Sequence, residues 1–340
     1  MENAVSTGTT RSRLWRAISI LLWLALLGLL GVLALPWVAP LPGLPAPVRA
    51  WCALVANFFP ALTLAAFALA LFGLILRRRR AMALAGLCLG MGGLPVLAAL
   101  HGSPQLDPEI QTLSVMTFNV WVGNDQTDRI VAYLRAKHPD IVFLEEVTEL
   151  HKQAFAPLAD LYPTQVTCHD SQARCETMIL SRFPAHWVRS GFIEGAAPPT
   201  AIAALDLGGG RTLTAVAVHL AQPFPGRRHD PQREQALHFA AGLSGYAGPV
   251  LVGGDFNGGL WARNQSDVES IAGLTGEPGL HPSWPAIPID GYRLPAWLRL
   301  PIDHILARGG PVVISAKTGP KLGSDHLPLL ATVALTDAGR

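Results

Sequence analysis

Three long apolar stretches dominate the first hundred residues of the chain. Residues 17–38 and 51–76 contain no charged side chain, and residues 81–100 form a third, weaker stretch with several glycines. About 20 apolar residues are enough for a helix to cross a bilayer. A signal peptide is the alternative for the first stretch, but a clean small-residue cleavage site is lacking and two more apolar stretches follow. We therefore predict a membrane anchor of three transmembrane helices, covering residues 1–104.

From residue 105 the pattern changes to short apolar segments separated by Pro, Gly and Asp. Segments typical of buried strands are 113–120, 140–144, 177–181, 201–206, 213–220, 249–253, 302–307, 312–315 and 329–334. Helical spacing of apolar residues occurs at 128–137, 149–159 and 231–243. Because few helices separate the strands, the pattern favours packed sheets in an α/β domain over residues 105–340, and not a doubly wound fold.

Charge is distributed unevenly between the two parts. Before residue 105 the chain has eight Arg, no Lys and one acidic residue, so 26 − 8 = 18 basic and 24 − 1 = 23 acidic residues remain for the rest. The second part therefore has a balance of −5. This acidic balance disfavours a protein that holds duplex nucleic acid through a basic surface.

The arginines of the first part lie in the short segments that flank the apolar stretches. Arg11, Arg13 and Arg16 precede the first stretch, residues 77–80 are four arginines after the second, and Arg49 alone lies between those two stretches. Cytoplasmic flanks carry the excess of Arg and Lys. Since three spans are an odd number, we predict a multi-pass protein of the bacterial inner membrane whose second part lies on the periplasmic side.

Cysteine usage is consistent with an oxidising compartment. Cys168 and Cys175 bracket a short polar loop and could close a small disulfide, although two unlinked thiols are an alternative. A zinc site is disfavoured because His169 is the only nearby ligand. Cys52 and Cys88 lie in or beside the apolar stretches.

Polar residues recur at the ends of the predicted strands. They are Asn119, Glu146, His219, Asp255, Asn257, Asp303, His304, Asp325 and His326. We expect Gly253-Gly254 to end one strand, so that Asp255 and Asn257 lie on one side of an extended segment, where they can activate water and orient an electrophile. Carboxylate and amide oxygens suit Mg²⁺, and histidines supply acid–base groups near neutral pH. With no nucleophile elbow, Walker loop or zincin motif, the predicted reaction is attack of water on a phosphate ester.

The order of these residues and their neighbours carries a family resemblance. The matching segments are Asn119, LEEV at 144–147, ILSR at 179–182, HL at 219–220, GDFN at 254–257, IDHI at 302–305 and SDHLP at 324–328. This set resembles the endonuclease/exonuclease/phosphatase superfamily and covers essentially all of residues 113–335. The resemblance implies a four-layered α/β sandwich, two packed sheets flanked by helices, and a Mg²⁺-dependent phosphoesterase in which Mn²⁺ is also possible.

The resemblance also implies a metal site. Glu146 would bind the metal, with Asn119 beside it and Asp325 next to it. The usual Gln before the metal-binding Glu is Glu145 here. Metal binding could thus be shared between the two neighbours, although strand alternation directs their side chains oppositely.

Five further positions would carry the chemistry if the resemblance holds. Asp255 would activate or orient the attacking water, Asn257 would hold a phosphate oxygen, and His219 would contact the phosphate. His326 would act as general acid–base or transition-state stabiliser, oriented by Asp303.

Three functions remain open from the sequence. The first is a membrane-anchored phosphodiesterase or phosphatase acting on a lipid headgroup or another small phosphoester. Trp121 favours it, since the DNA-repair branch has Asp there and Asn-x-Trp is more like the sphingomyelinase side of the family. The segment 292–300, with Trp and Leu among Arg, could enter a headgroup layer or be an ordinary packed loop.

The second function is an extracytoplasmic nuclease, with 227–229 (Arg-Arg-His) contacting a phosphate backbone. The third function is a non-catalytic membrane scaffold.

Overall fold

The computed structural model describes two compact units, residues 1–99 and residues 100–340. It describes the whole chain except the following residues: 1–3, 42, 101, 106–108, 169–175, 196, 225–230, 289–290, 293 and 337–340, together with the side chains of 4–12. The sequence features at Cys175 and at 227–229 therefore lie outside the described residues.

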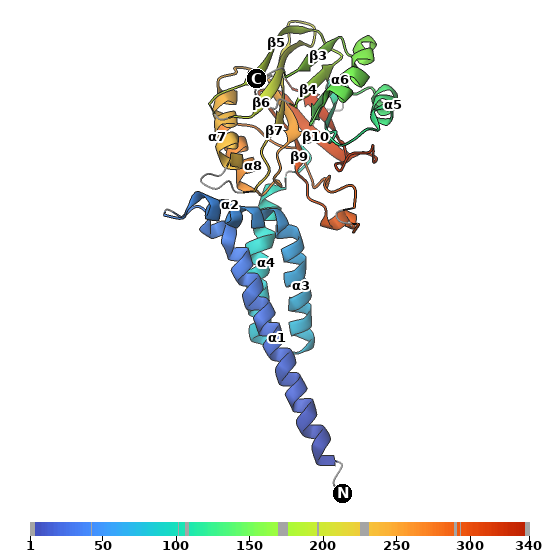
Figure 1. Ribbon diagram of the computed structural model, residues 1–340. Helices are drawn as coiled ribbons and strands as arrows, with labels where there is room; N and C mark the ends of the chain where they lie inside the picture. The colour runs from blue at the N-terminus through green and yellow to red at the C-terminus, as the bar shows by residue number, and fades with distance from the viewer. Residues whose placement is uncertain are drawn as a thin grey trace. The chain divides into compact units, whose positions relative to one another are not determined.

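The first unit is helical. Its elements are α1 (Ala4–Val38), α2 (Ala46–Leu54), η1 (Val55–Phe58), α3 (Phe59–Ile75) and α4 (Arg79–Ala99) (Figure 1). Three segments are long and apolar enough to cross a membrane, which confirms the predicted number of apolar helices; they are Arg13–Val38, Ala46–Ile75 and Arg79–Ala99.

Small residues allow these helices to pack closely. A Cβ atom added at Gly92 of α4 would lie 2.6 Å from the hydroxyl oxygen of Thr63 in α3 and 3.0 Å from a methyl group of Leu33 in α1. Lipid tails are as apolar as the helix surfaces, so close van der Waals packing through small residues is what holds such helices together.

The described part of the second unit contains two mixed sheets. The first has the strand order β10-β11-β1-β2-β4-β3 and the second the order β5-β6-β7-β8-β9. The strands are β1 (Thr112–Asn119), β2 (Ile141–Glu145), β3 (Thr164–Thr167), β4 (Met178–Ser181), β5 (Ala185–Phe192), β6 (Pro199–Asp206), β7 (Thr212–His219), β8 (Val250–Asp255), β9 (Asp303–Arg308), β10 (Pro311–Thr318) and β11 (Leu329–Leu335).

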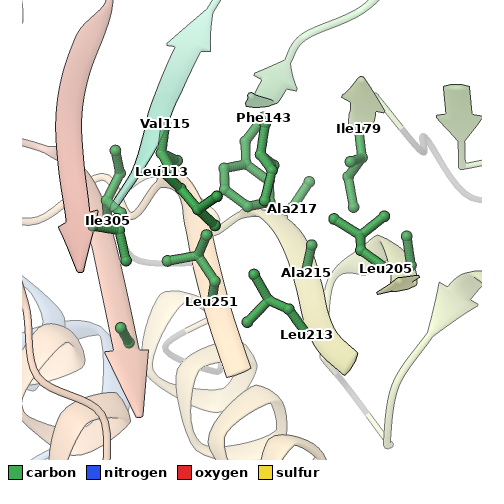
Figure 2. Packing of buried hydrophobic residues seen from close by; sticks show 14 of the residues in the cluster. Leu113, Val115, Phe143, Ile179, Leu205, Leu213, Ala215, Ala217, Leu251 and Ile305 are labelled. Atoms are coloured by element: carbon green, nitrogen blue, oxygen red, sulfur yellow. The ribbon is translucent and has the colours of Figure 1, made fainter. Parts of the chain in front are cut away.

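Alternation along the strands creates an apolar layer between the sheets. Val115 and Phe143 of the first sheet meet Leu213, Leu251 and Ile305 of the second in one buried cluster (Figure 2). Successive side chains of a strand point to opposite faces, so the residues between these positions face outward. The outward faces are apolar as well and need a cover.

Helices cover both outer faces. The flanking elements are α5 (Thr127–Lys137), α6 (Glu149–Phe155), η2 (Ala156–Asp160), α7 (Pro231–Ser244) and α8 (Arg263–Ala272). Ile130 of α5 packs with Met116 on the first sheet, and Phe239 of α7 packs with Val252 on the second. The order helix, sheet, sheet, helix confirms the predicted four-layered α/β sandwich.

Two strands and one α-helix in the described part of the second unit were not predicted from the sequence, and neither was the short helix η3 (Ala296–Leu298). Strand β5 is largely exposed along its length, and β3 has only four residues, so neither shows a clear apolar alternation. Helix α8 (RNQSDVESIA) is mainly polar and has few apolar residues to mark its buried face.

Gly253 and Gly254 lie within β8, so the predicted strand end at these glycines was wrong. A Cβ at Gly253 would lie 2.1 Å from the ring of Phe143 in the facing sheet, and one at Gly254 would lie 1.9 Å from the carbonyl oxygen of Val218. The absence of side chains thus permits close approach at this point of the strand, and β8 continues to Asp255.

Cys168 follows β3, is buried and is disulfide-bonded. Cys52 and Cys88 of the first unit are free and buried. A disulfide in the second unit is the state expected of a protein domain in an oxidising compartment.

Candidate active site

The ends of the central strands bring the polar residues together. Strands β1 and β2 are parallel, and so are β7 and β8, so each pair delivers its last residues to one edge. His219 is paired with Asp255 in register, and the antiparallel β9 starts at Asp303, directly opposite Asp255. Residues that are 255 − 219 = 36 and 303 − 255 = 48 positions apart in the sequence thereby become neighbours.

Asn119 connects the two sheets. Its side-chain amide donates one hydrogen bond of 3.0 Å to Oε1 of Glu146 and another of 3.0 Å to Oδ2 of Asp255. Its side-chain oxygen, Oδ1, accepts from the backbone N–H of Trp121 at 2.9 Å. A metal contact through Asn119 would therefore use the second lone pair of that oxygen.

Glu146 lies just beyond β2 and has a positive φ of 56°. This left-handed backbone turns its half-buried side chain toward Asn119, and Oε2 accepts the backbone N–H of Val122 at 3.0 Å. A non-glycine residue in this region is uncommon and tends to occur at functional sites.

Glu145 has the opposite environment. Its side chain is fully buried and accepts a hydrogen bond of 3.1 Å from Thr117. Burial raises the pKa of Glu145 well above its ordinary value, and the charges of Asp303 and Asp255 raise it further. Its raised pKa favours the protonated form of Glu145, whereas the ionised form is the usual metal ligand.

His326 is held among carboxylates. Its Nδ1 lies 2.9 Å from Oδ2 of Asp303, and its Nε2 lies 3.7 Å from Oδ2 of Asp255. Burial lowers the pKa of His326, but the charges of Asp303 and Asp255 outweigh this effect and raise it to about 10. His219 approaches the same oxygen of Asp255 from the other side, with Nε2 at 3.7 Å.

Asp255 is the common neighbour of these groups. It is 1% exposed, and burial raises its pKa, with His326 acting in the opposite direction and Asp303 adding to the increase. Its two oxygens face different partners, because Oδ1 accepts the backbone N–H of Asn257 at 2.8 Å while Oδ2 faces Asn119 and both histidines.

Asn257 occupies a tight turn and not the extended segment predicted from the sequence. Its φ is 49°, in the left-handed region that Asn tolerates better than most residues. The turn directs its side-chain amide to the carbonyl oxygen of Leu220 at 2.8 Å. That amide has a second N–H available for a substrate oxygen.

Asp325 lies beside the site and is half-buried. Its Oδ2 accepts a hydrogen bond of 3.1 Å from the indole N–H of Trp284. Burial raises the pKa of Asp325, and the positive charge of His326 acts in the opposite direction. The preceding residue, Ser324, donates to the carbonyl oxygen of Asn119 at 2.7 Å and accepts the backbone N–H of His326, which fixes this loop to the end of β1.

A set of buried side chains holds the turn after Asp255 through its carbonyl oxygens. Gln232 of α7 donates to the carbonyl oxygens of residues 256 and 257, and Asn264 of α8 donates to that of 256. His304 contacts the carbonyl oxygen of Gly258 through Nε2 and Glu277 through Nδ1, both at 2.8 Å. Sequence reasoning missed Gln232, Asn264 and Glu277, because no motif marks a residue that binds only the backbone of a distant segment.

The donor set fits a hard divalent cation. Ligand atoms of Asp255, Asp303 and His326 all lie within 4.8 Å of one another, and Oδ1 of Asp303 has no hydrogen-bond partner in the described structure. This cluster differs from Asn119, Glu146 and Asp325, the residues that the resemblance assigns to the metal. Asn119 joins this group to Glu146. Carboxylate oxygens around a polar edge are the ligands that Mg²⁺ and Mn²⁺ prefer.

A four-layered sandwich with carboxylates, amides and histidines at one edge of its strands defines a class of metal-dependent phosphoester-cleaving proteins. The sequence model of the Endonuclease/Exonuclease/phosphatase family matches residues 116–326, more than half of the chain. The chain therefore belongs to this family, as the resemblance predicted, and members of the family are metal-dependent phosphoesterases and nucleases.

Solved structures share the fold at low sequence identity. An endonuclease/exonuclease/phosphatase from Bacteroides vulgatus is 19% identical with a TM-score of 0.56, covering 66% of this chain and 99% of its own. One from Beutenbergia cavernae is 21% identical with a TM-score of 0.51, covering 67% and 72%. TDP2 from D. rerio, complexed with a single-strand DNA product, is 17% identical with a TM-score of 0.54, covering 66% and 99%. No curated protein matches the chain.

Proposed function

We propose that the chain is a membrane-anchored, metal-dependent phosphoesterase that hydrolyses a phosphodiester or phosphomonoester by attack of water. The observation that carries this proposal is the connected group in which Asn119 bonds both Glu146 and Asp255 while Asp255 and Asp303 flank His326. Such a group can hold a cation, a water and a phosphoryl group within one small volume.

Glu146 would hold the cation, with Asn119 and Asp325 beside it. When bound, Mg²⁺ or Mn²⁺ supplies Lewis-acid stabilisation of charge on the phosphoryl oxygens. The bond from Asn119 to Glu146 and the bond from Trp284 to Asp325 fix the orientation of both carboxylates, and ligand orientation of this kind affects metal affinity strongly.

The remaining residues act on the water and the phosphoryl group. Oδ2 of Asp255 accepts a proton from the attacking water, and Asn257 orients a phosphoryl oxygen with its free amide N–H. Protonated His326, held by Asp303, places positive charge where the transition state accumulates negative charge. His219 contacts the same phosphoryl group from the other side of Asp255.

The substrate class we favour is a lipid headgroup or another small phosphoester outside the cytoplasm. Three apolar helices suggest membrane association, and the acidic balance of the second part disfavours tight binding of nucleic acid. A nuclease is the second candidate, since the D. rerio structure of the same fold holds a single-strand DNA product.

The test is hydrolysis by the purified full chain in detergent of a panel containing a phosphomonoester, a dispersed phospholipid and supercoiled DNA. We expect Mg²⁺-dependent phospholipid turnover that EDTA abolishes and that falls about a thousandfold in His326→Ala. Glu146→Gln should instead raise the metal concentration required for half-maximal rate. DNA nicking with intact phospholipid would replace our substrate class by the second candidate. Indifference of every substrate to metal and to both substitutions would leave a non-catalytic scaffold.

A further inference from the structure

Trp284 and Leu300 are neighbours beside the site and begin and end a loop of which the structure describes residues 284–288, 291–292 and 294–300. Its base is closed by two backbone hydrogen bonds between these residues, 3.1 Å from Trp284 N–H to the Leu300 carbonyl and 2.6 Å in the reverse direction. The backbone N–H of Ser283 donates to the same Leu300 carbonyl at 3.0 Å. The two ends of the loop are therefore fixed together.

The base of this loop is attached to a candidate site residue. The indole of Trp284 donates to the side chain of Asp325, and the backbone N–H of Ala286 donates to the Asp325 carbonyl at 2.6 Å. Leu327 also donates to Ser283 at 3.1 Å. The base of the loop is therefore connected to Asp325 by direct hydrogen bonds from Trp284 and Ala286.

The outer part of the loop exposes aromatic side chains. Tyr292 is 79% exposed and Trp297, in the short helix η3 (Ala296–Leu298), is 63% exposed. They are the two most exposed large apolar residues in the described part of the second unit. A Trp and a Tyr on one exposed loop are costly in water and typical of a surface that meets a membrane interface.

Charge and chain length both indicate a lipid surface. Residues 284–300 contain two Arg and one acidic residue, Asp290, a balance of 2 − 1 = +1, whereas the second part as a whole has a balance of −5. Twelve residues, 100–111, separate α4 from β1 and can span at most about 40 Å. A bilayer holding the helices is therefore always within reach of the second unit, and Arg beside aromatic residues complements an anionic headgroup layer.

We propose that the described part of this loop, which carries Tyr292, Trp297 and Arg299, docks into the headgroup layer of a lipid bilayer and presents a phosphate ester of that layer to the site. Tyr292 and Trp297 enter the interface while Arg299 remains with the phosphates. The presentation of a lipid ester rests on the proposed phosphoesterase function, whereas docking itself does not.

Docking is tested independently of activity with a nitroxide label at Tyr292→Cys, which leaves Trp297 in place. The full chain, with Cys52 and Cys88 replaced by Ala, is placed in nanodiscs of phosphatidylcholine and phosphatidylglycerol. We expect the label to collide more with oxygen and less with a water-soluble nickel chelate than a label at Val188→Cys, an exposed apolar position on β5. Equal accessibility at the two positions would overturn the proposal.

Presentation of substrate is tested by the double variant Tyr292→Ser and Trp297→Ser. We expect its turnover of vesicle phospholipid to fall about tenfold while kcat/KM for a soluble nitrophenyl phosphodiester changes less than twofold. Trp187→Ser, an exposed Trp on β5, is the matched control and should change neither rate. Equal losses on both substrates would overturn the proposal that the loop presents the substrate.

Lack of turnover by the unsubstituted chain would reject the proposed function and leave the docking result standing. Stacking of single-stranded DNA on Trp297, seen as DNA-dependent quenching without lipid contact, would also count against the lipid surface.

Discussion

Glu145 and Glu146 differ in one respect that sequence alone does not reveal, namely the polarity around each carboxyl group. Because burial raises the pKa of Glu145, the folded chain keeps a proton on it that the unfolded chain loses above pH 4.5. The folded state then binds more protons than the unfolded state, so this group lowers stability as pH rises from 4.5.

We expect Glu145→Gln to fold and to retain activity within about threefold, since burial raises the pKa of Glu145 and the substitution puts a neutral amide of the same shape in its place. Its free energy of unfolding should exceed that of the unsubstituted chain by an amount that grows between pH 5 and 8, measured by urea unfolding. Glu145→Leu, which removes the bond to Thr117, is the control for hydrogen bonding. Loss of metal affinity in Glu145→Gln would show that Glu145 binds metal after all.

The buried pair of Glu277 and His304 gives a second pH dependence. Burial alone would raise the pKa of Glu277, but the nearby charge of His304 has the larger effect and the pKa of Glu277 is lowered. Burial alone would lower the pKa of His304, but the nearby charge of Glu277 has the larger effect and the pKa of His304 is raised. The contribution of Glu277 is lost as pH falls below 4.5, and that of His304 is lost as pH rises above 6.5.

Glu277→Gln should therefore destabilise the chain most between pH 4.5 and 6.5, by about 3 kcal/mol, because it leaves a buried imidazolium without its charged partner. Near-UV circular dichroism during urea unfolding measures this. Since His304 holds the carbonyl of Gly258, kcat should fall with little change in KM at pH 7. A stability difference that is constant from pH 4 to 8 would contradict the ion pair.

At the scale of the elements, Arg308 connects the C-terminal ends of two helices. It lies at the opposite end of β9 from Asp303. Its guanidinium donates to the carbonyl oxygens of Leu243 and Tyr246 at the end of α7 and of Ala272 at the end of α8. Leu243 and Ala272 lie in the last turns of α7 and α8, where the negative end of the helix dipole lies, and Tyr246 follows α7 and donates its backbone N–H to the Leu243 carbonyl at 3.0 Å. A cation at this place therefore stabilises both helix ends together.

We expect Arg308→Ala to lower the free energy of unfolding by about 3 kcal/mol, because several charge-assisted hydrogen bonds are lost at once. The value of kcat should stay within twofold, since the candidate site lies at the other end of the strand. Arg182→Ala, which breaks a half-exposed pair with Asp140, is the control and should cost less than about 1 kcal/mol. An equal loss in both variants would remove the capping role from Arg308.

The elements that could be predicted from sequence are those with a clear apolar run or a clear apolar alternation. Strands β2, β7 and β8 are buried on both faces and are largely apolar, and β1 begins with an alternation of buried and exposed residues. Strand β5 could not be predicted because it is exposed along most of its length. At the site, the strand-end residues could be predicted from their motifs. The left-handed turn at Asn257 could not, since it depends on bonds from two helices that are adjacent only in the fold.

For the whole molecule, the arginine distribution predicts that the second unit lies outside the cytoplasm. Alkaline phosphatase fused after residue 340 should be active in a bacterial host, and a green fluorescent protein at the same place should be dark. Replacing residues 77–80 by Ser and adding four Arg near Arg49 should reverse both signals. Fluorescence in the unaltered fusion would place the second unit in the cytoplasm.

The twelve-residue connection between α4 and β1 also changes how the rate depends on concentration. An enzyme tethered to the surface that contains its substrate samples a thin layer, so its effective local concentration is set by the tether and not by the volume of the compartment. Turnover of a membrane ester by the anchored chain would then follow the mole fraction of that ester in the bilayer and be insensitive to dilution of the vesicles. Release of the second unit by cleavage between residues 100 and 111 would convert the same site into one that responds to bulk dilution.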